Sequence, residues 1–196
     1  MANFASKSLF GGAISVDLPP NFIDVSEVRQ VPDNQEAYLD PDGFTSIVVE
    51  ILERVESEGG DDEAAFREHF KELTDESEDA KILPGSIRRV DISEVKLPAD
   101  VAIYTLDGSA PPGRNERDRQ AAAIPSGGAS ESDLPGTATV TVLVALLRLK
   151  AQDTDILISV NVPEHDKANL LEAAKQLRSR MVSTFEIKDW GLFVQE

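Results

Sequence analysis

The chain has 196 residues, of which 41% are hydrophobic, and this length and composition suit a globular fold with a sizeable core. Acidic residues outnumber basic ones by 36 to 19, giving a formal net charge of −17, so direct binding to nucleic acid or anionic lipid is disfavoured by repulsion between like charges. The absence of cysteine excludes disulfides, thiolate metal sites and a cysteine nucleophile.

The N-terminal segment and the apolar runs bear on membrane association. Residues 1–13 (MANFASKSLFGGA) lack the basic region and long apolar stretch of a secretory signal. No run approaches the ~18 apolar residues of a membrane span, since the longest, 140–147, contains Thr141 and precedes Arg148. We therefore expect no membrane insertion, an intracellular location and, for so negative a chain, a monomer.

The first strand pattern follows a pair of glycines. Residues 14–18 alternate apolar with polar side chains, which predicts a half-buried strand. Pro19 and Pro20 end that strand because neither can donate to a ladder of hydrogen bonds. Gly11 and Gly12 at its start predict a bulge or a close backbone contact.

A turn and two further strands are predicted before the first helix. Residues 24–27 (DVSE) predict a short turn or a helical start, with Asp24 free to cap it. The turn signal at 32–34 (PDN) then precedes a strand at 36–39. A second strand, rich in Ile and Val, is predicted at 46–52.

Two helices are predicted from apolar residues at helical spacing. The first covers about residues 61–73, where acidic residues in the first turn favour the positive end of the helix dipole. The second covers about residues 166–184. His69 lies beside the apolar stripe of the first helix and is expected to be a structural residue at its boundary, whereas His165 is expected to be exposed.

The second half of the chain predicts an antiparallel sheet. Strands are predicted at 86–95, 101–106, 140–149 and 156–162, the last two forming a hairpin, and a short strand or docked tail at 185–193. The continuous apolar run at 140–149 predicts a strand covered on both faces. We expect an α+β fold, an α/β/α sandwich around a mainly antiparallel sheet of about six strands, as one domain spanning 1–196. Residues 107–136, rich in Gly, Pro, Ser and charge, predict a disordered loop insert.

The sequence lacks the motifs of common catalytic and ligand-binding sites. It has no GxSxG, HExxH or GxGxxG, no P-loop and no EF-hand loop. We therefore predict no catalytic residue, no cofactor and no metal site, and a protein that is not an enzyme. Clustered carboxylates remain, yet their spacing matches no metal-binding loop, and each one alone is typical of a solvated rim.

Several segments together resemble the Ran guanine nucleotide release factor family, the Mog-type proteins. They are LFGGAIS at 9–15, PxxFIDVSEVRQVPDNQE at 19–36, SIVVEILE at 46–53, VALLRL at 144–149 and TDILISVNVP at 154–163. The resemblance implies a PsbP-like fold and a protein that binds the GTPase Ran, promotes release of its guanine nucleotide and supports nuclear protein import. It also implies a location in the nucleus and the cytoplasm. It leaves room for a further Ran-binding protein in the complex. The implied Ran-binding residues are Asp24, Glu27, Arg29, Asp33, Asn34, Gln35, Glu36, Glu50 and Glu53.

Our hypothesis for the mechanism is electrostatic. An acidic surface around Asp24, Asp33, Glu36 and Glu50 would engage basic groups of Ran, so that these groups or the bound Mg²⁺ no longer neutralise the phosphates. Residues three apart on a regular strand point to opposite faces, so Glu50 and Glu53 can face one partner only where the strand twists, bulges or ends.

Three other functions are compatible with the sequence. One is an adaptor that binds Ran or another basic partner without exchange activity, and another is a PsbP-like or lipoprotein-like domain of a different compartment. The last is a hydrolase, although the sequence offers no base–nucleophile pair.

Overall fold

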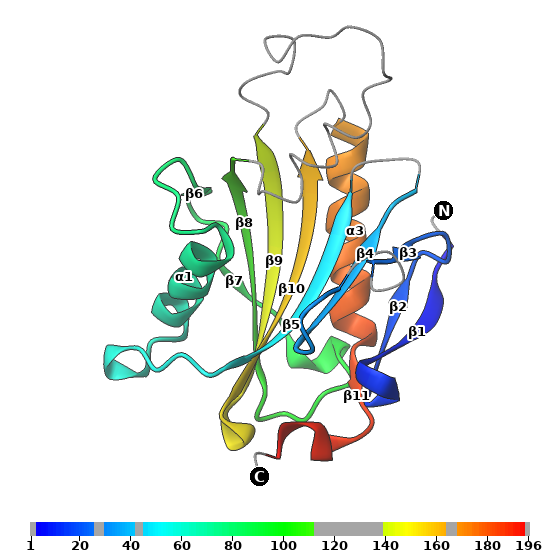
Figure 1. Ribbon diagram of the computed structural model, residues 1–196. Coiled ribbons are helices and arrows are strands. Elements are labelled where there is room, and N and C mark those ends of the chain that lie inside the picture. Colours follow the sequence, from blue (N-terminus) through cyan, green and yellow to red (C-terminus); the bar gives the residue numbers. More distant parts are fainter. Residues whose placement is uncertain (1–2, 26–29, 42–44, 112–138, 164–167, 195–196) are drawn as a thin grey trace, which may run out of the picture.

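Two antiparallel sheets form the framework of the protein (Figure 1). The computed structural model describes residues 3–25, 30–41, 45–111, 139–163 and 168–194. The larger sheet has eight strands in the order β3 (Ile23–Asp24), β4 (Gln35–Leu39), β5 (Ser46–Glu53), β10 (Thr154–Pro163), β9 (Val140–Leu149), β8 (Ala102–Ala110) and β6 (Lys81–Ile82), while β7 (Arg88–Arg89) also pairs with β8. The smaller sheet has the order β1 (Ala5–Leu9), β2 (Ile14–Leu18) and β11 (Glu186–Ile187).

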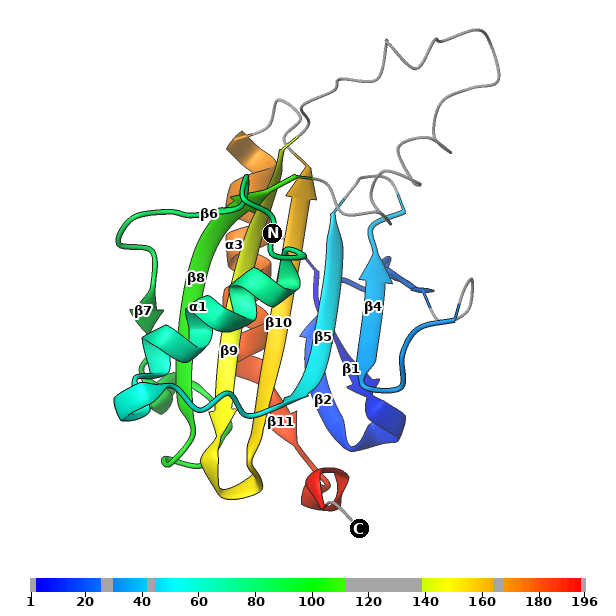
Figure 2. The ribbon, with the colours of Figure 1, turned by 60° about the vertical axis from the view of Figure 1, so that its left-hand side comes forward.

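The larger sheet is covered on both faces by helices. Helix α1 (Asp62–Leu73) packs Phe66 and Phe70 against β8, β9 and β10, through residues such as Leu106 and Leu146. Helix α3 (Ala168–Thr184) and the smaller sheet cover the other face. Figure 2 shows that α1 crosses β8 to β10 and leaves β4 and β5 beside it. The expected α+β sandwich is confirmed.

Glycine at position 108 allows α1 to approach the sheet closely. A Cβ atom built on Gly108 would lie 2.6 Å from Cζ of Phe70 and 2.9 Å from the carbonyl oxygen of Lys81. Real Cβ atoms do not approach neighbours this closely, so any side chain here would push Phe70 or the β6 backbone away. The helix layer therefore depends on the absence of a side chain at this point in β8.

The central strands form as the apolar patterns predict. In β9 every residue but Thr141 is buried, as expected for a strand covered on both faces. The β9–β10 hairpin turns through a 3-10 segment, Lys150–Gln152, and Asp153 adopts a left-handed conformation (φ 49°) before β10. Helix α1 begins one residue later than predicted, because the Asp61 side chain caps it by accepting from the Glu63 N–H at 2.9 Å. Both the hairpin and this helix are confirmed.

Several sequence-based predictions are wrong in detail. Gly11 and Gly12, at φ 65° and 96°, belong to the 3-10 turn Phe10–Gly12 that joins β1 to β2, and not to a bulge. Asp24 lies in β3 and Val25 after it is in a 3-10 conformation; since residues 26 and 27 lie outside the described residues, the turn or helical start at 24–27 stays a prediction. The predicted strand at 86–95 is reduced to β7 and a 3-10 segment, Ile92–Glu94.

The extent of the sheet also differs from the prediction. β8 continues to Ala110, so the first four residues of the predicted loop 107–136 belong to a strand, whereas 112–136 lie outside the described residues, as does His165. The larger sheet has eight strands instead of about six, because β3, β6 and β7 are two-residue edge strands. That residues 1–196 form one domain stays a prediction.

Candidate functional site

The pairing of β4 with β5 brings two predicted partner-binding residues together. Gln35 and Glu50 lie directly opposite each other in register, and Nε2 of Gln35 donates a hydrogen bond to Oε1 of Glu50. Glu50 also pairs with Leu157 on β10 and shares its face of β5 with Leu52, two residues further on. Both leucines pack in the cluster beneath α1. Glu50 therefore lies on the α1 face of the sheet, at the edge of the area that α1 covers.

Glu50 is a half-buried carboxylate. Burial raises the pKa of Glu50 above its ordinary value, while the hydrogen bond from Gln35 and the charge of His69 act in the opposite direction. The ionised form has thus already lost part of its hydration and has one oxygen oriented by Gln35. Such a group gives up less solvation and less side-chain freedom when it pairs with a cation of a partner.

Glu36 lies on the opposite face of the sheet and serves the fold. Its Oε1 accepts from the backbone N–H of Phe10 at 2.6 Å, and its Oε2 accepts from the hydroxyl of Tyr38 at 2.9 Å. Burial, followed by the charges of Glu36 and Asp24, strongly raises the pKa of Tyr38, which keeps that hydroxyl protonated as a donor. The structure therefore does not bring Glu36 and Glu50 to one acidic surface.

The remaining predicted residues are distributed around the β4–β5 edge. Asp33 and Asn34 are exposed in the turn before β4, and Asn34 Nδ2 donates to the carbonyl oxygen of Ile51 at 3.1 Å. The Ile51 N–H in turn donates to the Asn34 carbonyl at 2.9 Å, which fastens the turn to β5. Asp24 lies opposite Tyr38 in the β3–β4 pair. Glu27 and Arg29 lie outside the described residues.

Glu53 occupies the end of β5. The strand keeps its register as far as Glu53, which pairs with Thr154 and is exposed. Its side chain therefore leaves the strand on the face opposite to Glu50, as residues three apart must on a regular strand. A partner that contacts both carboxylates has to reach around this end of the sheet.

A buried network of charged side chains fastens α1 beside Glu50. Asp155, fully buried, accepts from Arg148 Nε at 3.0 Å through Oδ1, and its Oδ2 lies 2.8 Å from His69 Nε2. Arg148 also donates to Asp62 on α1 at 2.8 Å. His69 is only 1% exposed, so it is a core residue and not the boundary residue that the sequence predicts.

The roles of Arg148 and Asp155 were not predicted from the sequence. The available signal was one basic residue near the end of the apolar strand β9 and one acidic residue near the start of the apolar strand β10. A buried charge needs a charged partner, so the two could have been paired. Burial of His69 keeps it from reaching a substrate. Within the described parts of the chain, no group of three or more His, Asp and Glu side chains could hold a metal ion, and no helix is long and apolar enough to cross a membrane.

Comparison with known proteins places this arrangement in a family. The family model described as Ran-interacting Mog1 protein matches residues 7–163, which include β2, β4, β5, β9 and β10. The nuclear import protein MOG1 of Saccharomyces cerevisiae is 31% identical over 97% of this chain and 85% of the relative. The Ran guanine nucleotide release factor of Homo sapiens is 36% identical over 83% of this chain and 78% of the relative.

Solved structures agree with the sequence comparisons. The crystal structure of the Saccharomyces cerevisiae Ran-binding protein Mog1p matches 99% of this chain and 100% of its own, with a TM-score of 0.67 and 28% identity. The cyanobacterial PsbP of Synechocystis matches with a TM-score of 0.56 at 14% identity, which shows a shared fold alone. The chain therefore belongs to the family of Ran-interacting Mog1 proteins.

Proposed function

We propose that this protein binds the GTPase Ran and promotes release of its guanine nucleotide, in support of nuclear protein import. The names of its relatives supply the partner and the process. The structural observation that carries the proposal is the half-buried Glu50 carboxylate, held by Gln35 where β5 emerges beside α1. The protein acts by binding and not by making or breaking bonds, and it works in the nucleus and the cytoplasm.

The contact with Ran is centred on what we name the β5 edge surface, consisting of Asp33, Asn34, Gln35 and Glu50. Asp33 and Asn34 are exposed, and Gln35 and Glu50 are half-buried next to them. Glu53 extends this surface around the end of the strand. Glu36 supports it from the opposite face, because its carboxylate binds the Phe10 N–H of the β1–β2 turn and the Tyr38 hydroxyl, and Asp24 lies opposite Tyr38 in the β3–β4 pair.

Thermodynamic linkage sets how strong the interaction has to be. A factor that weakens nucleotide binding about 100-fold must favour nucleotide-free Ran by about 2.7 kcal/mol, and nucleotide must weaken the factor's binding equally. A close charge pair across an interface contributes on the order of 1.5–7 kcal/mol by double-mutant cycles. One cation withdrawn from the phosphates or from Mg²⁺ by Glu50 is therefore sufficient.

The test is release of a fluorescent guanine nucleotide from purified Ran with the wild-type protein, Glu50→Lys and Glu172→Lys. Glu172 lies on α3, its side chain is 68% exposed beside Lys175, and its replacement changes the net charge identically. We expect the wild type and the Glu172 variant to accelerate release and Glu50→Lys to lose most of the effect. Added salt should slow association of the active proteins.

Two outcomes would overturn the proposal. Binding of Ran without faster release would identify an adaptor, and a Glu50→Lys variant as active as the control would remove Glu50 from the contact. Binding is measured separately by calorimetry, so that loss of affinity and loss of release activity are distinguished.

A further inference from the structure

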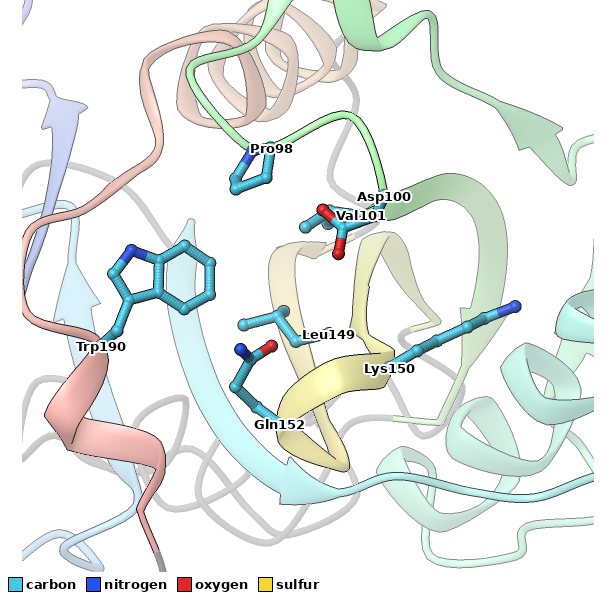
Figure 3. A pocket seen from close by; sticks show the side chains of 7 residues that line it. All are labelled: Pro98, Asp100, Val101, Leu149, Lys150, Gln152 and Trp190. Atoms are coloured by element: carbon cyan, nitrogen blue, oxygen red, sulfur yellow. The ribbon is translucent and has the colours of Figure 1, made fainter.

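A hollow lies at the end of the larger sheet that carries the β9–β10 turn (Figure 3). Three segments form it: the loop before β8, the β9–β10 turn and the C-terminal turn Trp190–Phe193. Its lining residues are Pro98, Asp100, Val101, Leu149, Lys150, Gln152 and Trp190. The four apolar residues, Pro98, Val101, Leu149 and Trp190, suit the aliphatic part of a side chain from another molecule.

The apolar walls of the hollow are held firmly by the core. Leu149 is 1% exposed and Val101 is 6% exposed, so both are fixed by packing. Trp190 is half-buried and its ring contacts the ring of Phe193 edge-on, with centroids 6.0 Å apart. Figure 3 shows the indole on one side of the hollow, with its six-membered ring turned toward Leu149, and Asp100 on the other side.

The lining of the hollow has one carboxylate, Asp100, and one ammonium group, Lys150. Lys150 belongs to its rim, but its ammonium group points away from Trp190 and lies 3.3 Å from the Asp62 carboxylate (Figure 3). Asp100 is exposed and forms no ion pair among the residues that the structure describes. An apolar slot with an indole on one side and an unpaired carboxylate on the other complements a long side chain that ends in a cation.

We propose that this hollow binds an arginine side chain of a protein partner. The methylene groups would lie against Val101 and Leu149, and the planar guanidinium would pair with Asp100 beside the indole. Arginine suits the site better than lysine, because a guanidinium can stack on an aromatic ring and bond both oxygens of one carboxylate.

The hollow lies close to the proposed contact with Ran. Leu149, which lines it, pairs with Thr154, and Thr154 pairs with Glu53 at the end of β5. The C-terminal turn beside it also exposes Leu192 (36%) and Val194 (73%). A basic partner that reaches around this end of the sheet can therefore use Glu53 and the hollow together. This last step rests on the proposed function, whereas the chemistry of the hollow does not.

The decisive experiment uses the natural fluorescence of the site. Trp190 is the only tryptophan in the chain, so its emission reports binding in the hollow directly. The protein is titrated with N-acetyl-arginine amide and, as the uncharged counterpart, N-acetyl-citrulline amide. Asp100→Asn tests the carboxylate, and Asp79→Asn, an exposed residue in the turn after α1, is the matched control.

We expect a saturable change in emission with the arginine compound in the millimolar range and a much weaker response to citrulline. Asp100→Asn should weaken binding by about 3- to 10-fold, because one exposed charge pair is lost, and Asp79→Asn should leave it unchanged. A linear response, an equal response to citrulline, or insensitivity to Asp100→Asn would overturn the proposal.

Nucleotide release from Ran, measured with the same variants, separates the two proposals. A wild-type protein that binds the arginine compound but does not affect Ran would refute the proposed function and leave the hollow as a site for another basic partner. Faster release by the wild type without binding of the arginine compound would refute the hollow alone.

Discussion

Removal of the Asp155 carboxylate tests the buried network beneath α1. Oδ1 of Asp155 accepts from Arg148, and Oδ2 accepts from the Val55 N–H at 3.1 Å and lies 2.8 Å from His69. Asp155→Ala would leave Arg148, 2% exposed, with one carboxylate fewer and would orphan two further polar groups. Breaking a buried pair in this way costs about 3–5 kcal/mol. We therefore expect a loss of about 3–5 kcal/mol in the free energy of unfolding.

Urea unfolding, followed by circular dichroism, measures this loss. The matched control is Glu68→Ala, which removes a surface ion pair with Lys71 (2.9 Å) on the same helix and should change stability by less than about 1 kcal/mol. Since about 1 kcal/mol corresponds to roughly 2–4 °C for a chain of this size, Asp155→Ala should also lower Tm by roughly 6–20 °C. A loss for Asp155→Ala no larger than that of the control would refute the idea that the network anchors α1.

Three further predictions concern the α1 layer and the β5 edge surface. Gly108→Ala should destabilise the fold by about 1–3 kcal/mol in thermal unfolding, because the added Cβ would overlap the ring of Phe70; unchanged stability would contradict this contact. Gln35→Leu should weaken binding of Ran by about 3- to 10-fold, and loss of the hydrogen bond should raise the pKa of Glu50 further. The affinity for Ran, measured by calorimetry, should therefore fall at a higher pH for Gln35→Leu than for wild type as the solution is acidified. Equal pH profiles would refute the positioning role of Gln35. Although burial acts to raise the pKa of Asp62, hydrogen bonds and charge from Lys150, Tyr104 and Arg148 hold this pKa below its ordinary value. The stabilising contribution of Asp62 is therefore present above the unfolded-state pKa and is lost as the pH falls through the folded-state pKa. Urea unfolding at several pH values should show that Asp62→Asn loses less stability than wild type on acidification, and identical slopes would contradict this assignment.

The long elements could be predicted from sequence because their burial leaves a periodic signal. β9 is apolar at nearly every position since helices cover both of its faces, and α1 shows Phe66 and Phe70 at helical spacing. The two-residue strands β3, β6 and β7 leave no such signal. They form only because a longer neighbour offers free backbone groups at its edge.

The candidate site was predictable in composition but not in orientation. The resemblance identified Gln35 and Glu50 by type, yet only the β4–β5 register shows that they bond to each other. Glu36 looks equally acidic in the sequence, and its role depends on Phe10, which is 26 residues away along the chain. Likewise, Asp155 and His69 are 86 residues apart, and no local pattern reports their contact.

The bond between Glu36 and the Phe10 backbone affects how mutational scans of this protein are interpreted. Neighbouring positions 35 and 36 belong to opposite layers, one facing α1 and the other holding the hairpin of β1 and β2. An alanine at Glu36 would release that hairpin and the Tyr38 hydroxyl together, and weaker Ran binding would follow from displacement of β4. Loss of binding at consecutive positions of this strand therefore does not by itself define a contact footprint.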